Sequence, residues 1–355
     1  MLRKNLKGKL MQKIKDNDIR LDFGDVLINP SPSNVPLTRK SVDIKIDWLD
    51  TTAYPIAISN MISTGTYNIA KILTPMQVFT FIHKEYTLDQ HRKELSNLND
   101  RRFIAITTGV RDQDVEKTIE IIREFPDIAM INVDVANVYA NMKGMITSIK
   151  RFAQEFPTIK ISAGNVANDV VIKDLVSAGA HYIKVGVGSG AACKTRSEVG
   201  VGIPQVSAVM ECHNEAIKYG AKIISDGGCV TAGDVCKAIA AGAEIVMIAG
   251  MVSKSEECDN IIEIDGKKYV NFYGLGSTKM YNLTNPTEQE YRPNEGRDLL
   301  IPCNGSIKDV IYQIQGGLRS VCTYVGAEHI SEIYNRTQFV RVNNTINKSL
   351  EKYEQ

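Results

Sequence analysis

The sequence predicts a single closed barrel of eight parallel strands that alternate with helices, the (β/α)₈ or TIM-barrel class of α/β fold. Eight short apolar runs, each ending in Gly, Asn, Asp or another polar residue, recur along the chain. Most are separated by about 15–20 residues of helical composition, the alternation that builds parallel sheets. An open doubly wound sheet is the alternative, but the Gly-rich fingerprint that follows its first strand is missing. One domain is therefore expected over residues 1–355.

The apolar runs are nearly continuous instead of strictly alternating, as expected of parallel strands that are covered on both faces. In chain order the predicted strands are residues 54–60, 78–83, 103–108, 130–134, 159–165, 182–188, 222–226 and 244–250. Helical composition is clear over residues 169–180 and 231–243, and a last helical segment is expected at about residues 306–316.

Two long connections interrupt the regular repeat. One follows the sixth strand, from Gly188 to about Lys222, and the other is a polar flap after the eighth strand, at about residues 251–302. Both leave the carboxyl ends of strands, the face on which barrel enzymes carry their chemistry. Long loops in compact barrels are usually functional, so both are candidates for the site. Residues 1–20 are expected to be a basic leader outside the barrel.

Composition excludes several classes of protein. The 42 Lys and Arg residues balance 41 Asp and Glu residues, so the excess of positive charge typical of nucleic-acid binding is absent. No apolar run of about 18 residues predicts a membrane span, and the basic N-terminus lacks the apolar core of a secretory signal. Seven cysteines, an odd number, indicate free thiols in a reducing compartment. A cytoplasmic protein is expected.

Cys193 is the candidate nucleophile. It lies in a Gly-rich loop next to the cations Lys194 and Arg196, and positive charge favours a thiolate. Thr195, two residues on, is a possible proton partner. The alternative is a small buried side chain, the commonest fate of a free cysteine.

Two further loops resemble anion sites. Ser225-Asp226-Gly227-Gly228 ends the seventh predicted strand, and Ala249-Gly250 ends the eighth. Barrels frequently bind phosphate with the loops that follow these two strands. Asp226 is then placed to accept hydrogen bonds from sugar hydroxyls. Each motif alone is weak, because tight turns need glycine in any case.

Charged residues elsewhere could serve the site or have only a structural or solvated role. Lys84 and Asp134 stand at or just beyond the ends of the second and fourth predicted strands, where side chains face the mouth of a barrel or pack inside it. Glu295, in the flap, is by default a solvated charge. The segment that holds Arg319 and Ser320 reads as a helix end.

Taken together, the motifs resemble those of the GMP reductase family, in the superfamily that also contains IMP dehydrogenase, across nearly the whole chain. The matching segments are residues 21–27, 134–137, 163–166, 183–188, 193–196, 200–205, 207–212, 224–229, 272–274, 291–292 with 295–296, and 317–326.

Three features favour the reductase over the dehydrogenase within this resemblance. The dehydrogenase usually carries an inserted regulatory domain after the second strand, and here that connection is short. Its flap carries an Arg-Tyr pair that activates water, and residues 251–302 contain no such dipeptide. The reductase-like segments Asp134-Val-Ala-Asn137 and Glu295-Gly296 are present instead. A dehydrogenase without the regulatory domain remains the alternative.

The resemblance implies NADPH-dependent reductive deamination of GMP to IMP and ammonia. Cys193 would attack C2 of the guanine ring to form a covalent adduct. Thr195 and Glu295 would move the proton that lets ammonia leave. GMP and IMP are then the small-molecule ligands, in purine nucleotide interconversion.

The resemblance also implies the binding residues and a homotetramer. Positions around the ribose and phosphate are Asp226, Gly227, Gly228, Ala249 and Gly250, and positions around the base are Leu275, Gly276, Arg292 and Asn294. Positions on the cofactor side, in part across a subunit boundary, are Lys84, Asp134, Tyr291, Arg319 and Ser320. A monovalent cation, K⁺ in the family, would be held by backbone carbonyls near Gly188, Gly190 and Cys193.

The chain departs from the family pattern at several positions. Ala191 replaces the serine that usually precedes the nucleophile by two residues, which removes a phosphate-binding hydroxyl. Lys194 and Gly276 replace a threonine and a base-side serine. A second alternative therefore stands, a nucleotide-binding barrel whose reaction has weakened or been lost.

Overall fold

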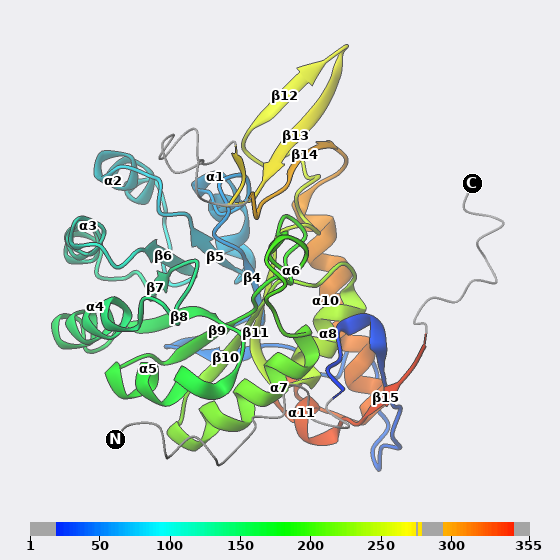
Figure 1. The fold of residues 1–355 in the computed structure, drawn as a ribbon. Helices are drawn as coiled ribbons and strands as arrows, with labels where there is room; N and C mark the ends of the chain where they lie inside the picture. Colours follow the sequence, from blue (N-terminus) through cyan, green and yellow to red (C-terminus); the bar gives the residue numbers. More distant parts are fainter. Residues whose placement is uncertain (1–18, 275, 279–293, 344–355) are drawn as a thin grey trace, which may run out of the picture.

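The computed structural model describes residues 19–274, 276–278 and 294–343. Eight parallel strands close into a barrel in the order β4-β5-β6-β7-β8-β9-β10-β11, with β11 paired to β4 (Figure 1). They are β4 Ile56–Ile58, β5 Phe79–Ile82, β6 Ile104–Thr108, β7 Met130–Asp134, β8 Lys160–Val166, β9 Tyr182–Val185, β10 Lys222–Asp226 and β11 Ala243–Ile248. Each overlaps one predicted strand, so the predicted fold class is confirmed.

The strands are apolar because helices cover them outside and side chains fill the barrel inside. Every residue of β5, β6 and β9 is buried. The strand β9 ends at Val185, earlier than the predicted 182–188. The reason is backbone geometry: Gly186 and Gly188 have φ values of 150° and 79° and turn the chain out of the sheet.

Helices surround the barrel as an outer layer, visible on the left and lower side of Figure 1. They are α1 Tyr67–Leu73, α2 Leu88–Ser96, α3 Asp112–Glu124, α4 Met142–Glu155, α5 Ile172–Ala178, α6 Thr195–Glu198, α7 Gln205–Ala216, α8 Ala232–Ala240, α10 Ile307–Val325 and α11 Ile333–Arg336. Short 3₁₀ turns are Phe23–Asp25, Thr74–Met76, Asp169–Val171, Ile217–Tyr219 and Ile330–Glu332. The predicted helices at 169–180 and 231–243 correspond to α5, with the turn before it, and to α8.

The last long helix extends well beyond the prediction. The expected end at residue 316 is wrong: α10 continues through Gly316 and Gly317 to Val325. A Cβ at Gly317 would lie 3.0 Å from the Cβ of Ala232 in α8, so this glycine lets the two helices approach closely. The segment read as a helix end is therefore the middle of a helix, because a packing contact outweighs the low helix propensity of glycine.

The flap contains regular structure that the sequence analysis did not predict. β12 Ile261–Ile264, β13 Lys267–Tyr273 and β14 Asp298–Pro302 form a three-stranded antiparallel sheet, which projects from the barrel in Figure 1. Val270 and Phe272 are buried on its inner face, and Asn271 between them is partly exposed. This alternation stabilises an antiparallel sheet with one solvated face.

Two small antiparallel pairs lie outside the barrel. They are β1 Val26–Ile28 with β15 Phe339–Arg341, and β2 Ile46–Trp48 with β3 Thr51–Ala53. Within the described part of the chain, no helix is both long and apolar enough to cross a bilayer. Of the expected leader, residues 1–18 lie outside the described residues.

Candidate active site

Cys193 lies half-buried in the loop that follows β9, at the carboxyl end of that barrel strand. Glycine is needed at the start of this loop, since a Cβ at Gly188 would lie 2.6 Å from the Cγ of Arg196. Arg196 belongs to α6, which begins at Thr195, directly after the cysteine loop. The thiol therefore stands at the mouth of the barrel, outside the aliphatic core.

Backbone pairing joins the cysteine loop to the flap. Cys193 forms an isolated antiparallel bridge with Gly296. Lys194 donates its backbone N–H to the carbonyl of Glu295 over 2.6 Å, and Arg297 donates to the carbonyl before Cys193 over 2.9 Å. Two segments about one hundred residues apart in sequence are thus held in register, as in a short β-ladder.

Three side chains form a continuous chain of contacts at this junction. The Cys193 Sγ and the Thr195 Oγ1 are 3.1 Å apart, and the Thr195 hydroxyl donates to Glu295 Oε2 over 2.6 Å. A hydroxyl has one proton to donate. Since that proton points to Glu295, the hydrogen bond between sulfur and oxygen requires the thiol to donate to Thr195. The arrangement can move a proton from the sulfur to the carboxylate.

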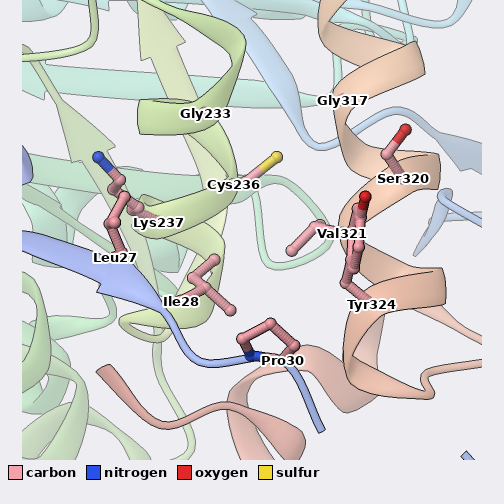
Figure 2. A pocket seen from close by; sticks show the side chains of 10 residues that line it. All are labelled: Leu27, Ile28, Pro30, Gly233, Cys236, Lys237, Gly317, Ser320, Val321 and Tyr324. Carbon is pink, nitrogen blue, oxygen red and sulfur yellow. The ribbon is translucent and has the colours of Figure 1, made fainter. Parts of the chain in front are cut away.

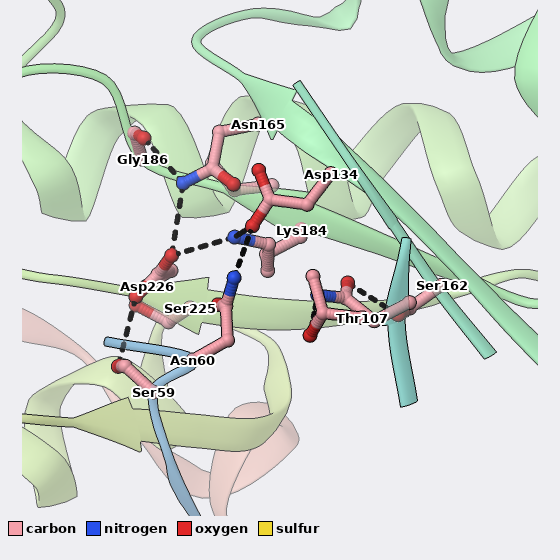
Figure 3. Close-up of polar contacts among 12 residues, drawn as sticks. Ser59, Asn60, Thr107, Asp134, Ser162, Asn165, Lys184, Gly186, Ser225 and Asp226 are labelled. Carbon is pink, nitrogen blue, oxygen red and sulfur yellow. Dashed lines mark hydrogen bonds and ion pairs between the residues drawn. The ribbon is translucent and has the colours of Figure 1, made fainter. Parts of the chain in front are cut away.

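A second polar cluster lies at the carboxyl ends of the neighbouring strands (Figure 3). Its centre is Lys184 in β9, whose Nζ donates to Asp134 Oδ2 and to Asp226 Oδ2, each over 2.9 Å. Asn60 donates to Asp134 over 2.7 Å, and Asn165 donates to Asp226 over 2.9 Å. The polar side chains around this lysine thus come from four different parts of the barrel, namely β7, β8, β10 and the loop after β4.

Lys184 and Asp134 are ionised. Burial by itself lowers the pKa of Lys184, but the two carboxylates outweigh burial and the pKa stands above its ordinary value. Burial alone would raise the pKa of Asp134. The nearby Lys184 charge and the hydrogen bonds from Lys184 and Asn60 outweigh burial, so the pKa of Asp134 lies below its ordinary value. Lys184 is 2% exposed and Asp134 15%, so these charges interact with little solvent screening.

The glycines predicted to hold phosphate meet the cysteine loop. A Cβ at Gly227 would lie 2.7 Å from Ser189 Oγ and 2.9 Å from the backbone nitrogen of Gly190. A Cβ at Gly250 would lie 3.1 Å from the Cβ of Ala191. The loops after β9, β10 and β11 therefore lie against one another, and Ala191 occupies the point where a side-chain hydroxyl would face Gly250.

The flap places its base-side residues beside the proton chain. A Cβ at Gly276 would lie 3.3 Å from the Cβ of Glu295, and the backbone N–H of Gly296 donates to the carbonyl of Gly276. Asn294 Oδ1 accepts a hydrogen bond from the same N–H over 3.2 Å. Leu275, Tyr291 and Arg292, also predicted for the site, lie outside the described residues.

Lys84 follows β5, near the Asp134 carboxylate. Its positive charge contributes to the lowered pKa of that carboxyl. Hydrogen bonds from helix α3 hold the loop that carries Lys84. Lys117 in α3 donates to the carbonyls of Lys84 and Tyr86 over 2.7 and 2.9 Å. The backbone carbonyl of Lys84 is thereby held in place.

The structure does not bring Arg319 and Ser320 to the cysteine. Both lie in α10 of the outer layer, where Arg319 donates to the carbonyl of Val42 and Ser320 Oγ accepts from the side chain of Arg39. Ser320 lines a mostly apolar groove of about 380 Å³ (Figure 2). The groove is formed by Leu27, Ile28, Pro30, Gly233, Cys236, Lys237, Gly317, Ser320, Val321 and Tyr324.

The carbonyls predicted to hold a monovalent cation lie in the loop between β9 and α6. The carbonyl of Gly190 accepts one hydrogen bond, from the N–H of Cys193 over 3.0 Å, which leaves a lone pair for another partner. Among the side chains of the described residues, no three His, Cys, Asp or Glu converge as ligands of a metal ion. Backbone oxygens are therefore the donors to consider here.

Sequence reasoning assigned no role to Lys184, Asn60 or Asn165. One signal was available for Lys184, since a lysine in the middle of an otherwise apolar strand must find a counter-charge when buried. Nothing in the sequence shows which carboxylates those are, because the partners come from strands 50 and 42 residues away.

Comparisons with known proteins agree with this geometry. The sequence matches the IMP dehydrogenase / GMP reductase domain over residues 20–350. It is 40% identical to GMP reductase 2 of Homo sapiens over 340 residues, which cover 94% of this chain and 97% of that protein. Identity is 37% to GMP reductase of Onchocerca volvulus, covering 96% and 95%, and 39% to GMP reductase of Photobacterium profundum, covering 92% and 96%. The chain therefore belongs to the IMP dehydrogenase / GMP reductase family.

Proposed function

We propose that this protein is a GMP reductase, an enzyme that converts GMP to IMP and ammonia with NADPH as reductant. The observation that carries the proposal is the contact chain from the Cys193 sulfur through Thr195 to Glu295 at the barrel mouth. The relatives named GMP reductase support the choice of substrate. GMP and IMP are the small-molecule ligands.

The first step uses the proton chain. The Cys193 thiol gives its proton to Thr195, which gives its own proton to Glu295. The thiolate then adds to C2 of the guanine ring, and the π pair of the C2–N3 double bond moves to N3, from which it re-forms the double bond when ammonia leaves. Thr195 is suited to this relay because its hydroxyl is within hydrogen-bond reach of both the sulfur and the carboxylate.

The second step releases ammonia. The bond between C2 and the exocyclic amine breaks, and the amine takes the proton stored on Glu295, returned through Thr195. The thiol proton thus ends on ammonia, and the purine remains attached to sulfur. An amine leaves poorly without that proton, so Glu295 must act as base in the first step and as acid in the second.

The remaining residues bind and orient the substrate. Asp226 accepts hydrogen bonds from the ribose hydroxyls, while the backbone around Gly227, Gly228, Ala249 and Gly250 receives the phosphate. On the base side, Gly276 and Asn294 lie next to the proton chain. We assign Leu275 and Arg292 to the same side on the family resemblance.

The cofactor side is formed by Lys84 and Asp134, with Tyr291 assigned by the resemblance. Asp134 Oδ1 accepts none of the hydrogen bonds found among the described residues, so it is available to a bound ligand. NADPH, when bound, supplies the hydride that takes the place of the sulfur at C2, and Cys193 leaves as the thiolate.

We further propose that the protein is a homotetramer in which Arg319 and Ser320 serve a neighbouring subunit. These residues lie in α10, apart from the cysteine of their own chain, beside an apolar groove with an exposed tyrosine, Tyr324. Such a groove suits the planar adenine end of a dinucleotide. Size-exclusion chromatography with light scattering tests the assembly.

A monovalent cation, K⁺, would be held by the carbonyls of Gly188, Gly190 and Cys193 and would stiffen the cysteine loop. All seven cysteines are free thiols, which supports a cytoplasmic location. Activity measured in K⁺ buffers and in tetramethylammonium buffers tests the role of the cation.

The deciding experiment follows the absorbance of NADPH with GMP as substrate, in the wild-type protein and in Cys193→Ser. We expect NADPH loss with equimolar ammonia and IMP in the wild type, and none above background in the variant. An equal background rate in both proteins would refute the proposal and favour a binding barrel. Formation of NADH from IMP would identify a dehydrogenase instead.

A further inference from the structure

Lys184 is the one charged side chain of β9, and the proposed reaction assigns it no step. It is 2% exposed and is among the largest fully buried side chains of the described chain. Its stem passes over Gly164 of the neighbouring strand, where a Cβ would lie 2.6 Å from the Cβ of Lys184. A buried ammonium costs several kcal/mol unless it is paired, so its position requires an explanation.

Lys184 binds one oxygen of each of two carboxylates, and an amide supports it on each, Asn60 on Asp134 and Asn165 on Asp226. It contacts Oδ2 of Asp134 and Oδ2 of Asp226 (Figure 3). Asp134 Oδ1 has no hydrogen bond among the described residues, and Asp226 Oδ1 accepts only a 3.2 Å bond from Ser59. Lys184 and the two amides therefore fix which oxygen of each carboxylate stays available to a ligand, and of these three side chains only Lys184 contacts both carboxylates.

We propose that Lys184 is a positioning residue that holds the cofactor-side carboxylate Asp134 and the ribose-side carboxylate Asp226 correctly turned, so that one buried charge prepares both halves of the site. This inference rests on the proposed function, because it takes the two ligand assignments from there. It adds a residue that touches neither ligand and controls the binding of both.

The electrostatics lead to a specific consequence of losing the lysine. Lys184 carries one positive charge between two negative ones, and the other titratable groups near them are Lys84, facing Asp134, and Cys229, facing Asp226. Without Lys184, two buried carboxylates remain close together with no cation between them. Like charges in such a site do not both ionise, so one carboxylate takes up a proton near neutral pH.

The experiment measures binding by calorimetry, with GMP and separately with NADP⁺, so that no turnover is needed. Lys184→Met keeps the length of the side chain and removes the charge. We expect the dissociation constants of both ligands to rise about tenfold or more at neutral pH. GMP binding should improve more steeply in the variant than in wild type as the pH is raised from about 7 to about 8.5, a range above the second pKa of the GMP phosphate, about 6.

A second substitution makes the test independent of a purely structural role. In Lys184→Met/Asp134→Asn the cluster returns to its original net charge, since the second change removes one carboxylate. GMP binding should recover to within about threefold of wild type, while NADP⁺ binding stays weak, because Asp226 can ionise again and Asp134 is lost. If the single variant does not fold, this charge-balanced double variant carries the test alone.

Two controls complete the set. Lys184→Arg keeps the charge and should restore the wild-type pH profile for GMP binding. Lys45→Met removes a lysine whose Nζ donates to Gln77 over 2.6 Å, before β5 at the opposite end of the barrel, and should leave both affinities unchanged.

The inference is overturned if Lys184→Met is folded and binds both ligands within twofold of wild type, or if the double variant does not regain GMP binding. A wild-type protein that binds GMP and NADP⁺ without consuming NADPH refutes the proposed reaction only, and the affinities still decide the role of Lys184. A wild-type protein that binds neither ligand refutes both.

Discussion

Replacing Glu295 with glutamine removes the proton acceptor of the site and leaves its geometry in place. The amide oxygen can still accept the hydrogen bond from Thr195, which spans 2.6 Å in the wild type. The pairing of this segment with the cysteine loop is unaffected, because it is made by the backbone carbonyl of Glu295 and the N–H of Lys194. The variant therefore isolates proton transfer from positioning.

The expected size of the effect follows from what general acid–base catalysis contributes. Loss of a positioned proton-transfer group costs about 10²–10⁴ in rate, or roughly 3–5 kcal/mol of transition-state stabilisation. Glu295 serves as base and acid in the deamination half of the proposed reaction. Exchange that starts from IMP also needs the Cys193 thiolate, which Glu295 helps to form through Thr195, but this half has no amine to protonate. Glu295→Gln should therefore slow exchange less than it slows ammonia release.

Two assays separate the halves. Ammonia release with GMP and NADPH reports the complete reaction, and exchange of labelled hydride between IMP and NADP⁺ reports the second half alone. We expect ammonia release to fall at least a hundredfold, and exchange to fall less. An equal loss in both assays would contradict the role assigned to Glu295, and so would an unchanged rate of ammonia release.

Three further predictions follow from particular contacts. Ala191→Ser places a hydroxyl against Gly250, since a Cβ built at Gly250 would lie 3.1 Å from that of Ala191. The KM for GMP should fall about tenfold, because a hydrogen bond to a charged group contributes about 1.5–3 kcal/mol. An unchanged KM would show that the phosphate does not reach this point. Gly317→Leu should destabilise the fold by about 1–3 kcal/mol in urea titrations, because it pushes α10 away from α8. Gly316→Ala lies in the same helix, and its Cβ would meet no neighbouring element within 4 Å, so it should stabilise the fold by up to about 1 kcal/mol. The same sign for both variants would contradict the packing argument. Burial, with Lys117 nearby, lowers the pKa of His83 to about 4 and that of His91 to about 3, so the stability that these two histidines contribute above pH 6.5 is lost as the pH falls. Together they should account for at most about 4 kcal/mol of the drop in the free energy of unfolding between pH 7 and pH 5, and His91→Leu should remove about half of their share.

The barrel could be predicted because its determinants are local. Apolar runs such as that of β6 record burial on both faces, and the intervening segments record helices, so strand order follows from the alternation. Strand ends were less predictable. The positive φ at Gly186 that ends β9 comes from the close approach of β10, where a Cβ would lie 1.9 Å from the carbonyl oxygen of Asp226.

The same division applies to the site. Cys193 and Thr195 are two residues apart, so their proximity could be expected from the chain itself. Glu295 looked like a solvated charge in a polar loop, and only the family resemblance pointed to a catalytic role. The structure brings it to Thr195 through a backbone bridge between the flap and the cysteine loop, a contact that no local pattern encodes.

By itself, the sequence determined the alternation of strands and helices, and it placed Cys193 and Thr195 close together in one loop. Tertiary structure alone decided that Lys184 lies between Asp134 and Asp226, that α10 continues past two glycines, and that the flap is an antiparallel sheet. The physical reason is the separation of interacting residues along the sequence. Periodicity reports whether a residue is buried, whereas the partner of a buried charge or a close-packed glycine is chosen by segments that meet only when the barrel closes.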